Sequence, residues 1–231
     1  MKDRMEPATL RAITNNQNWC QRVAEIHQVE TKLEANYWCS KDPMPTFFPN
    51  LITLNESTTQ ALLEEVIPVQ GSYFVKDCFA ALSLDPLGFT KLFDANWYIK
   101  KALPPLRSFN NVKISEATSA DGLAEWETLW RGEENYTPIY PSSVLDSETI
   151  RFFTAESNGQ AAGITSFNDT HTLGIYNLWG ESSLFSALIG HLQMLYPNQD
   201  IVGYGDEQEV QRLEALGFEI LTPLTVWGRF A

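Results

Sequence analysis

Apolar and polar positions alternate along several short segments of the second half of the chain, a pattern typical of β-strands. Ser157-Asn158-Gly159 joins two of these segments and predicts a tight hairpin, because Asn and Gly accept the backbone geometry of such turns. Apolar residues every three or four positions predict helices elsewhere, the first capped by Thr118 or Ser119. The expected strands are 112–117, 150–156, 160–168, 172–179, 201–204, 218–221 and 224–230, and the further helices follow Ser183 and span Asp206 to Leu216.

The first half of the chain has the same two kinds of pattern. A helical stripe runs from Leu10 to His27, and Ser57-Thr-Thr-Gln60 has the form of a capping box that opens a second helix through Val66. Prolines and glycines separate the remaining apolar runs. These runs predict strands at 32–39, 50–54, 73–84 and 90–99.

A break between two parts is expected near Lys100–Asn111, where adjacent prolines interrupt the apolar pattern. The words LGFTKLF, from Leu87, and LGFEILT, from Leu216, resemble each other and stand near the end of each part. In both, the glycine suits a chain reversal that leads into a strand. We therefore expect two related units, residues 1–111 and residues 112–231.

Composition indicates a globular protein of the cytoplasm. The chain has 231 residues, of which 44% are hydrophobic, which suffices for a sizeable core. No apolar run reaches the roughly 18 to 20 residues of a membrane helix, and MKDRMEPATL lacks the apolar stretch of a secretory signal. The three cysteines are odd in number and lack CxxC spacing, so we expect reduced thiols and no metal site.

The negative charge is concentrated in the second half. Residues 1–112 carry 11 basic and 12 acidic side chains, whereas residues 113–231 carry 5 basic and 17 acidic ones. The net charges of the two halves are therefore −1 and −12. Such an acidic protein repels nucleic acid and anionic membranes, and neither is an expected partner. A small-molecule amine, which is cationic at neutral pH, suits this field.

The order of elements in residues 112–231, with the words SNGQAAGITSF and LEALGFE, resembles the GNAT superfamily of N-acetyltransferases. The resemblance implies an α/β (α+β) fold, in which helices flank a mixed, mostly antiparallel central sheet. The first half resembles a diverged or partial N-terminal copy through LGFTKLF. The resemblance also implies acetyl-CoA as cosubstrate, with its pantetheine arm between two diverging parallel strands, here Tyr176–Trp179 and Ile201–Tyr204.

In the family, a glycine-rich turn after the first of these strands holds the pyrophosphate of acetyl-CoA. This chain departs from that pattern, because the turn has one glycine, no arginine and an added carboxylate. A carboxylate beside a phosphate is unfavourable by roughly 1 to 4 kcal/mol. An alternative explains the same residues as a helix cap, with Ser182 or Ser183 at the N-terminus of a structural helix. The cofactor-binding candidates are Leu178, Trp179, Gly180, Glu181, Ser182, Ser183 and Arg212.

The chain also departs from the family pattern at the position of the catalytic acid, and this bears on the candidate catalytic residues. Leu213 stands where many members carry a tyrosine that returns a proton to the leaving thiolate. Tyr204 or Tyr176 can take over as the acid, and Asp206 as the base, with Glu207 and His171 as alternatives for the base. Each also has a structural explanation: the tyrosines as core aromatics and Asp206 as an N-cap.

Three hypotheses follow. The first is an acyl-CoA-dependent N-acyltransferase that moves an acetyl group from acetyl-CoA to an amine. The second is a non-catalytic GNAT-like protein that binds a small metabolite or a protein partner, which Glu181 and Leu213 favour. The third is an interaction module, in which the apolar, Pro-rich segment YWCSKDPMPTFFPN forms a homodimer interface or closes over a cleft.

Overall fold

The computed structural model describes residues 7–102, 111–133 and 136–231. Contacts divide the chain into two compact units, and neither is continuous in sequence. The N-terminal unit comprises residues up to Tyr98 together with Tyr204–Gln211 and Glu219–Ala231. The C-terminal unit comprises Ile99–Gly203 and Arg212–Phe218. That the two units are related copies stays a prediction.

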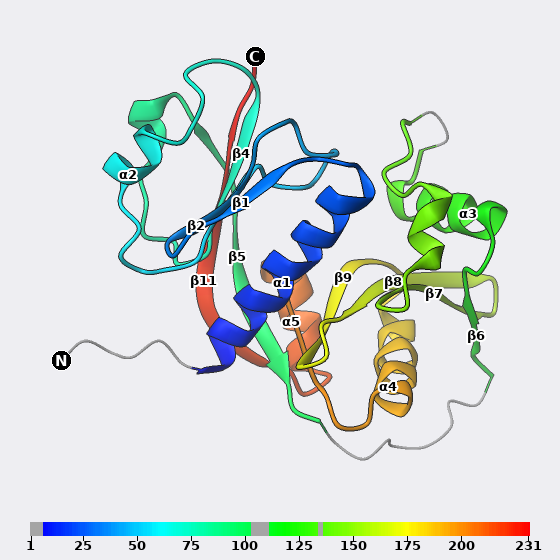
Figure 1. Ribbon diagram of the computed structural model, residues 1–231. Coiled ribbons are helices and arrows are strands. Elements are labelled where there is room, and N and C mark those ends of the chain that lie inside the picture. The colour runs from blue at the N-terminus through cyan, green and yellow to red at the C-terminus, as the bar shows by residue number, and fades with distance from the viewer. Residues whose placement is uncertain (1–6, 103–110, 134–135) are drawn as a thin grey trace. The chain divides into compact units, whose positions relative to one another are not determined.

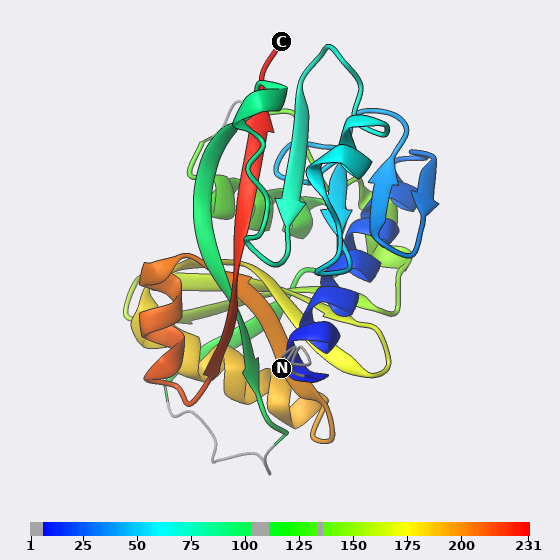
Figure 2. The ribbon, with the colours of Figure 1, turned by 90° about the vertical axis from the view of Figure 1, so that its left-hand side faces the viewer.

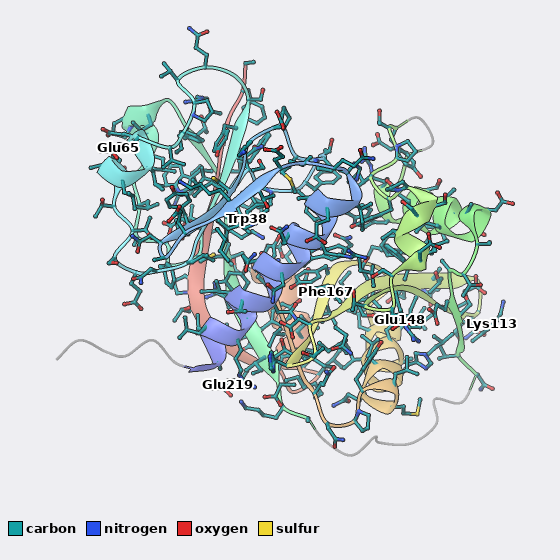
Figure 3. All side chains as sticks on the ribbon, viewed as in Figure 1. Trp38, Glu65, Lys113, Glu148, Phe167 and Glu219 are labelled. Carbon is teal, nitrogen blue, oxygen red and sulfur yellow. The ribbon has the colours of Figure 1, made fainter. Side chains whose placement is uncertain are left out.

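The N-terminal unit is built on strands in the order β1-β2-β3-β4-β11-β5. The last strand of the chain, β11, pairs antiparallel with β4, and Figure 2 shows the two side by side. The buried core of this unit includes Trp38, which Figure 3 labels. The elements are α1 (Pro7–Ile26), β1 (Thr31–Leu33), β2 (Tyr37–Ser40), β3 (Leu51–Thr53), α2 (Gln60–Glu64), β4 (Tyr73–Asp77), the 3-10 helix η1 (Asp85–Leu87), β5 (Thr90–Lys100) and β11 (Glu219–Arg229).

Several predicted boundaries in this unit are wrong, because side chains end or begin elements where the apolar pattern continues. The strand expected at 73–84 ends at Asp77, whose carboxylate accepts hydrogen bonds from the backbone N–H groups of Phe79 and Leu82. The strand expected at 32–39 is a hairpin of β1 and β2. The two strands expected at the C-terminus are one, β11, which continues through Pro223.

The predicted capping box is also wrong in its residues. Thr59, not Ser57, is the N-cap of α2, and its side chain accepts a hydrogen bond from the backbone N–H of Leu62. Ser57 instead donates its hydroxyl to the side chain of Asn55. The prediction failed because a polar side chain nearby offered Ser57 another local partner.

The two LGF words adopt the same turn. Gly88 and Gly217 both have the left-handed backbone, with φ of 78° and 81°. The N–H of Phe89 donates to the carbonyl of Leu84, and that of Phe218 donates to Leu213. In each case the glycine N–H donates three residues back, so both turns are Schellman motifs that end a helix and open a strand. This confirms the predicted chain reversal.

The C-terminal unit contains strands in the order β10-β9-β8-β7-β6. Helices α3 and α4 lie on opposite faces of these strands (Figure 1). Adjacent residues of β7 show this, since Phe152 packs on Trp126 of α3 and Phe153 on His191 of α4. The elements are β6 (Lys113–Glu116), α3 (Ala120–Arg131), the 3-10 helix η2 (Ser142–Asp146), β7 (Ile150–Ser157), β8 (Gln160–Asn168), β9 (Thr172–Gly180), the 3-10 helix η3 (Ser182–Leu184), α4 (Phe185–Leu195) and the start of β10 (Asp200–Gly205). The end of β10 and most of α5 (Glu207–Glu214) belong to the N-terminal unit, because Tyr204–Gln211 is assigned there.

The sequence predictions hold better here. Ser119 caps α3 by accepting from the N–H of Gly122. Asn158 and Gly159 form the two-residue loop of the β7–β8 hairpin, with φ of 50° and 77°. Most neighbouring strands pair antiparallel, with parallel pairs at β3–β4 and β9–β10. The predicted mixed, mostly antiparallel architecture is confirmed.

The three cysteines lie in the core. Cys20, Cys39 and Cys78 are buried and unbridged, and burial raises the pKa of the Cys20 thiol to about 11. None of the helices in the described part of the chain combines the length and apolarity needed to cross a lipid bilayer.

Candidate functional site

The parallel strands β9 and β10 are paired only at their beginnings. Their register contains Thr172 with Asp200, Leu173 with Ile201, and Gly174 with Val202, and it ends there. β9 nevertheless continues to Gly180, and β10 to Gly205. From Ile175 onward β9 therefore continues beyond its register with β10.

A bulge turns β9 at this point. The register between β8 and β9 shifts between Gly163 and Thr165, and Asn177 takes a left-handed backbone with φ of 51°. Its side-chain amide donates to the hydroxyl of Tyr140 at 2.5 Å and to that of Thr165 at 3.2 Å. Asn tolerates this backbone better than most residues, and its two hydrogen bonds hold the bulge in place.

A buried carboxylate supports the loop that carries Tyr140. Glu127 of α3 is 1% exposed and accepts hydrogen bonds from the backbone N–H groups of Ile139, at 2.7 Å, and Tyr140, at 3.3 Å. Two N–H donors compensate for part of the desolvation of the carboxylate. A polar chain thus runs from α3 through Tyr140 to the bulge in β9.

Aromatic rings pack around the same bulge. The ring of Trp126 lies 5.0 Å from Phe152 and 6.2 Å from Trp179, measured between centroids. Trp179 lies over Gly163, where an added Cβ would stand 2.4 Å from the indole. The indole N–H of Trp179 is buried and has no hydrogen-bond partner among the described residues. This face of β9 is a rigid aromatic support.

Three backbone donors of the turn after β9 are in use. The N–H of Glu181 donates to the carbonyl of Ala161 at 2.9 Å, and that of Leu184 donates to the carbonyl of Glu181 at 3.0 Å. The N–H of Ser183 donates to the carboxylate of Glu181 at 3.2 Å. The predicted alternative of a helix cap is therefore correct in kind, but the capping side chain is Glu181 and not Ser182 or Ser183.

Gly180 is required by packing. Its φ is 90°, and a Cβ there would stand 2.3 Å from the carbonyl oxygen of Ala161. The glycine thus allows β9 to approach β8 and leads the chain into the turn. Its presence is explained without a phosphate.

The described cations of the C-terminal unit are mostly paired with carboxylates. Lys113, labelled in Figure 3, pairs with Glu156 at 3.6 Å, and Arg151 pairs with Glu116 at 3.7 Å. Arg212 is exposed on α5. Taken with the turn, this arrangement does not fit the diphosphate of acetyl-CoA, because three of the turn's donors are used and the charge in the turn, on Glu181, is negative.

Of the predicted catalytic residues, Tyr176 belongs to the C-terminal unit, whereas Tyr204 and Asp206 belong to the N-terminal unit. Tyr176 is buried in β9, next to the bulge. Asp206 accepts from the N–H of Glu209 at 2.9 Å and so caps α5. A common catalytic role for these three residues stays a prediction.

Tyr204 has an unexpected neighbour. The ammonium of Lys76 lies 3.9 Å from the centroid of its ring, and the ring packs on Trp97 at 5.4 Å. Lys76 is 2% exposed and also donates to the side chain of Asn16 at 2.7 Å. Burial favours a lower pKa for Lys76, but Tyr204 and the neighbouring thiols outweigh it, and the pKa is raised. The ammonium is thus held charged against the tyrosine ring.

Leu213, at the position of the family's tyrosine, is fully buried and serves the core. The residues that sequence reasoning missed are Asn177, Tyr140, Glu127 and Lys76. A polar residue in an apolar strand was the one available signal for Asn177. The sequence around Tyr140, Glu127 and Lys76 gives no such signal, because their hydrogen-bond partners lie 12 to 60 positions away along the chain.

Comparison with solved structures identifies the fold. A functionally unknown conserved protein from Staphylococcus epidermidis superposes with a TM-score of 0.64 at 11% identity, over 86% of this chain and 92% of that one. A GCN5-related N-acetyltransferase from Kribbella flavida superposes with a TM-score of 0.60 at 12% identity, over 98% of this chain and 96% of that one. A GCN5-related N-acetyltransferase-like protein from Streptococcus suis superposes with a TM-score of 0.51 at 12% identity, over 96% of this chain and 98% of that one.

These similarities extend over nearly the whole chain, so the fold includes both units. A scan against protein-family models found no match, and a search of curated proteins found none either. The protein has the fold of the GCN5-related N-acetyltransferases, and the resemblance inferred from sequence is confirmed at the level of the fold.

Proposed function

We propose that the C-terminal unit is an N-acyltransferase unit that takes an acyl thioester along the edge of β9 beyond Gly174 and passes the acyl group to an amine. The observation that carries this proposal is the end of the β9–β10 register at Val202, while both strands continue. Strands that separate in this way leave backbone donors and acceptors for an extended, amide-containing arm.

The chain's own contribution to such a reaction would be binding and orientation. The bulge at Asn177 changes the direction of the backbone groups of β9, and the aromatic support beneath it keeps them rigid. A fixed N–H group can stabilise the oxyanion that forms when an amine attacks an acyl carbonyl. Holding the two reactants together supplies much of the remaining rate enhancement.

We propose a small cationic amine as the acceptor. The net charge of −12 on residues 113–231 attracts cations and raises their local concentration. The roles predicted from sequence complete the proposal: Asp206 takes the proton of the amine, and Tyr176 or Tyr204 returns a proton to the leaving thiolate. The cytoplasm remains the expected compartment.

Acetyl transfer tests this proposal directly. The purified chain is incubated with acetyl-CoA, or with the truncated thioester S-acetyl-N-acetylcysteamine, and with a panel of polyamines and aminoglycosides. Thiol release that requires the amine supports the proposal. If neither thioester binds at millimolar concentration and none is turned over, the proposal is wrong.

A second candidate is a non-catalytic protein that binds a small metabolite at the same edge. Glu181, which closes the turn, and Leu213, which cannot transfer a proton, favour it. Binding of a thioester without amine-dependent thiol release in any acceptor mixture would select this candidate over the enzyme.

A further inference from the structure

In the turn that follows β9, backbone N–H groups donate to the protein's own acceptors, including the carboxylate of Glu181. We infer that Glu181 is a specificity-determining residue that excludes diphosphate-bearing ligands from this turn, so that the C-terminal unit prefers acyl thioesters that lack the nucleotide. The preference among thioesters rests on the proposed function, whereas the exclusion of a diphosphate by Glu181 does not.

The first argument is the use of the donors. An anion site at a helix N-terminus needs several N–H groups that point outward together. Here the N–H groups of Glu181, Ser183 and Leu184 donate within the turn or to β8. The N–H of Phe185 donates to the carbonyl of Ser182. A diphosphate would have to displace these bonds to obtain equivalent ones.

The second argument is that the carboxylate of Glu181 is held from two sides. One oxygen accepts from the N–H of Ser183 at 3.2 Å, and the other accepts from the side-chain amide of Gln160 at 3.2 Å. Gln160 begins β8, so the carboxylate is tied to a second strand as well as to its own turn. Two hydrogen bonds thus hold the carboxylate beside the N-terminus of η3.

The third argument is charge. The carboxylate carries a full negative charge at the mouth of the turn. At about 4 Å, and with an effective dielectric constant between about 20 and 80, one such charge weakens the binding of a second by roughly fivefold to eight-hundredfold. Four of the described cations in the C-terminal unit already pair with other carboxylates: Lys101, Lys113, Arg131 and Arg151.

Binding calorimetry at low ionic strength tests the inference on the full chain. The probes are acetyl-CoA, S-acetyl-N-acetylcysteamine and ADP, the last reporting on the diphosphate alone. For the wild type we expect S-acetyl-N-acetylcysteamine to bind at least as tightly as acetyl-CoA, and ADP not to bind. Acetyl-CoA that binds at least tenfold more tightly than the truncated thioester would overturn the inference.

Two variants separate the charge from the cap. Glu181→Gln keeps an oxygen for the N–H of Ser183 but removes the charge, and we expect about tenfold tighter binding of acetyl-CoA and detectable ADP binding. Glu181→Ala also frees the N–H of Ser183, and we expect a larger gain. The affinity for S-acetyl-N-acetylcysteamine should not change. A residue that only capped the helix would not alter the ratio between the ligands.

Glu148→Gln is the matched control, since it removes one exposed carboxylate from the same unit, and Figure 3 shows its position. It should leave ADP binding unchanged, and an equal gain there would overturn the inference by showing that net charge alone is responsible. Folded variants of Glu181 that gain no affinity for ADP would also overturn it. If no variant binds either thioester but Glu181→Gln gains ADP binding, the proposed function is wrong and the role of Glu181 stands.

Discussion

The two parts of β9 beyond its last pair with β10 differ in how their backbone groups are used. Around Asn177 the strand lies beyond its register with its parallel neighbour and bulges away from β8. After Gly180 the chain bonds to itself, because β8 and Glu181 accept from three N–H groups of the turn. The same strand therefore presents an open stretch followed by a closed one.

This difference shows that a glycine in a strand-to-helix turn has more than one physical explanation. In a phosphate-binding turn, glycine gives the ligand access to the backbone. In this protein, Gly180 instead gives β8 access, because Ala161 occupies the space of the missing Cβ. Changes at the two parts of β9 should accordingly have different effects.

The largest effect is expected from Gly180→Ala. The new Cβ would stand 2.3 Å from the carbonyl oxygen of Ala161, and the φ of 90° disfavours any residue with a side chain. We expect the free energy of unfolding to fall by about 3 to 5 kcal/mol. Chemical denaturation measures this loss.

Gly159→Ala provides the control for that change. Gly159 also has a positive φ, of 77°, but no atom lies within 4 Å of the place that a Cβ would occupy. Only the backbone strain remains, and we expect a loss of about 1 to 2 kcal/mol. Equal losses at the two glycines would show that packing of the turn on β8 contributes nothing.

Glu127→Ala is expected to have the next largest effect, through the support of the open stretch. It would leave the buried N–H groups of Ile139 and Tyr140 without their acceptor. We expect a loss of about 2 to 3 kcal/mol in the free energy of unfolding, measured by denaturation. Glu125→Ala, an exposed residue of the same helix, should change it by less than about 0.5 kcal/mol.

Asn177→Ala should have a smaller effect, of about 1 to 2 kcal/mol. It removes two hydrogen bonds and places alanine at a φ of 51°. Asn177→Gly keeps the backbone geometry and loses only the hydrogen bonds, so it should be the less damaging of the two. If Asn177→Gly is the more damaging, the left-handed backbone at the bulge is not the source of strain.

The smallest expected effect is a dependence on pH through His191 of α4. Burial lowers the pKa of His191, and Glu116 opposes this shift. The unfolded chain, with an ordinary pKa of about 6.5, then binds a proton more readily than the folded chain does. Stability from this group is complete above that pH and declines as the pH falls toward the lower pKa of the folded state.

Melting temperatures measured between pH 8 and pH 5, a range set by the ordinary His pKa of about 6.5, check this expectation. Replacement by His191→Gln should flatten the decline. Glu116→Gln should steepen it, because the opposing charge is lost. A steeper decline in His191→Gln than in the wild type would contradict the assigned direction.

The sequence predicted the architecture of the C-terminal unit well because its signals are local. Alternation in β7 and β8, the Asn-Gly loop between them and the cap at Ser119 each depend on residues a few positions apart. The Schellman turns at Gly88 and Gly217 were found for the same reason. The boundaries failed where a side chain found a competing local partner, as Asp77 and Ser57 do.

The candidate site was less predictable, because its determinants are long-range. The end of the β9–β10 register, the contact between Lys76 and Tyr204, and the hydrogen bonds of Glu127 join segments distant in sequence. The unfavourable charge of Glu181 was visible in the sequence, but its role as the cap that uses the N–H of Ser183 depends on the turn geometry. The assignments of Arg212, Tyr176, Tyr204 and Asp206 to cofactor and catalysis stay predictions.

The most direct measurement of the central proposal is a titration of the ¹⁵N-labelled chain with S-acetyl-N-acetylcysteamine and, separately, acetyl-CoA, followed by backbone amide chemical shifts. We expect both ligands to shift the amides of Ile175 to Leu178 and to leave those of Glu181 to Leu184 nearly unchanged. Shifts confined to the turn with acetyl-CoA, or no shift along β9 with either thioester, would contradict the proposal that β9 beyond its register with β10 is the binding element.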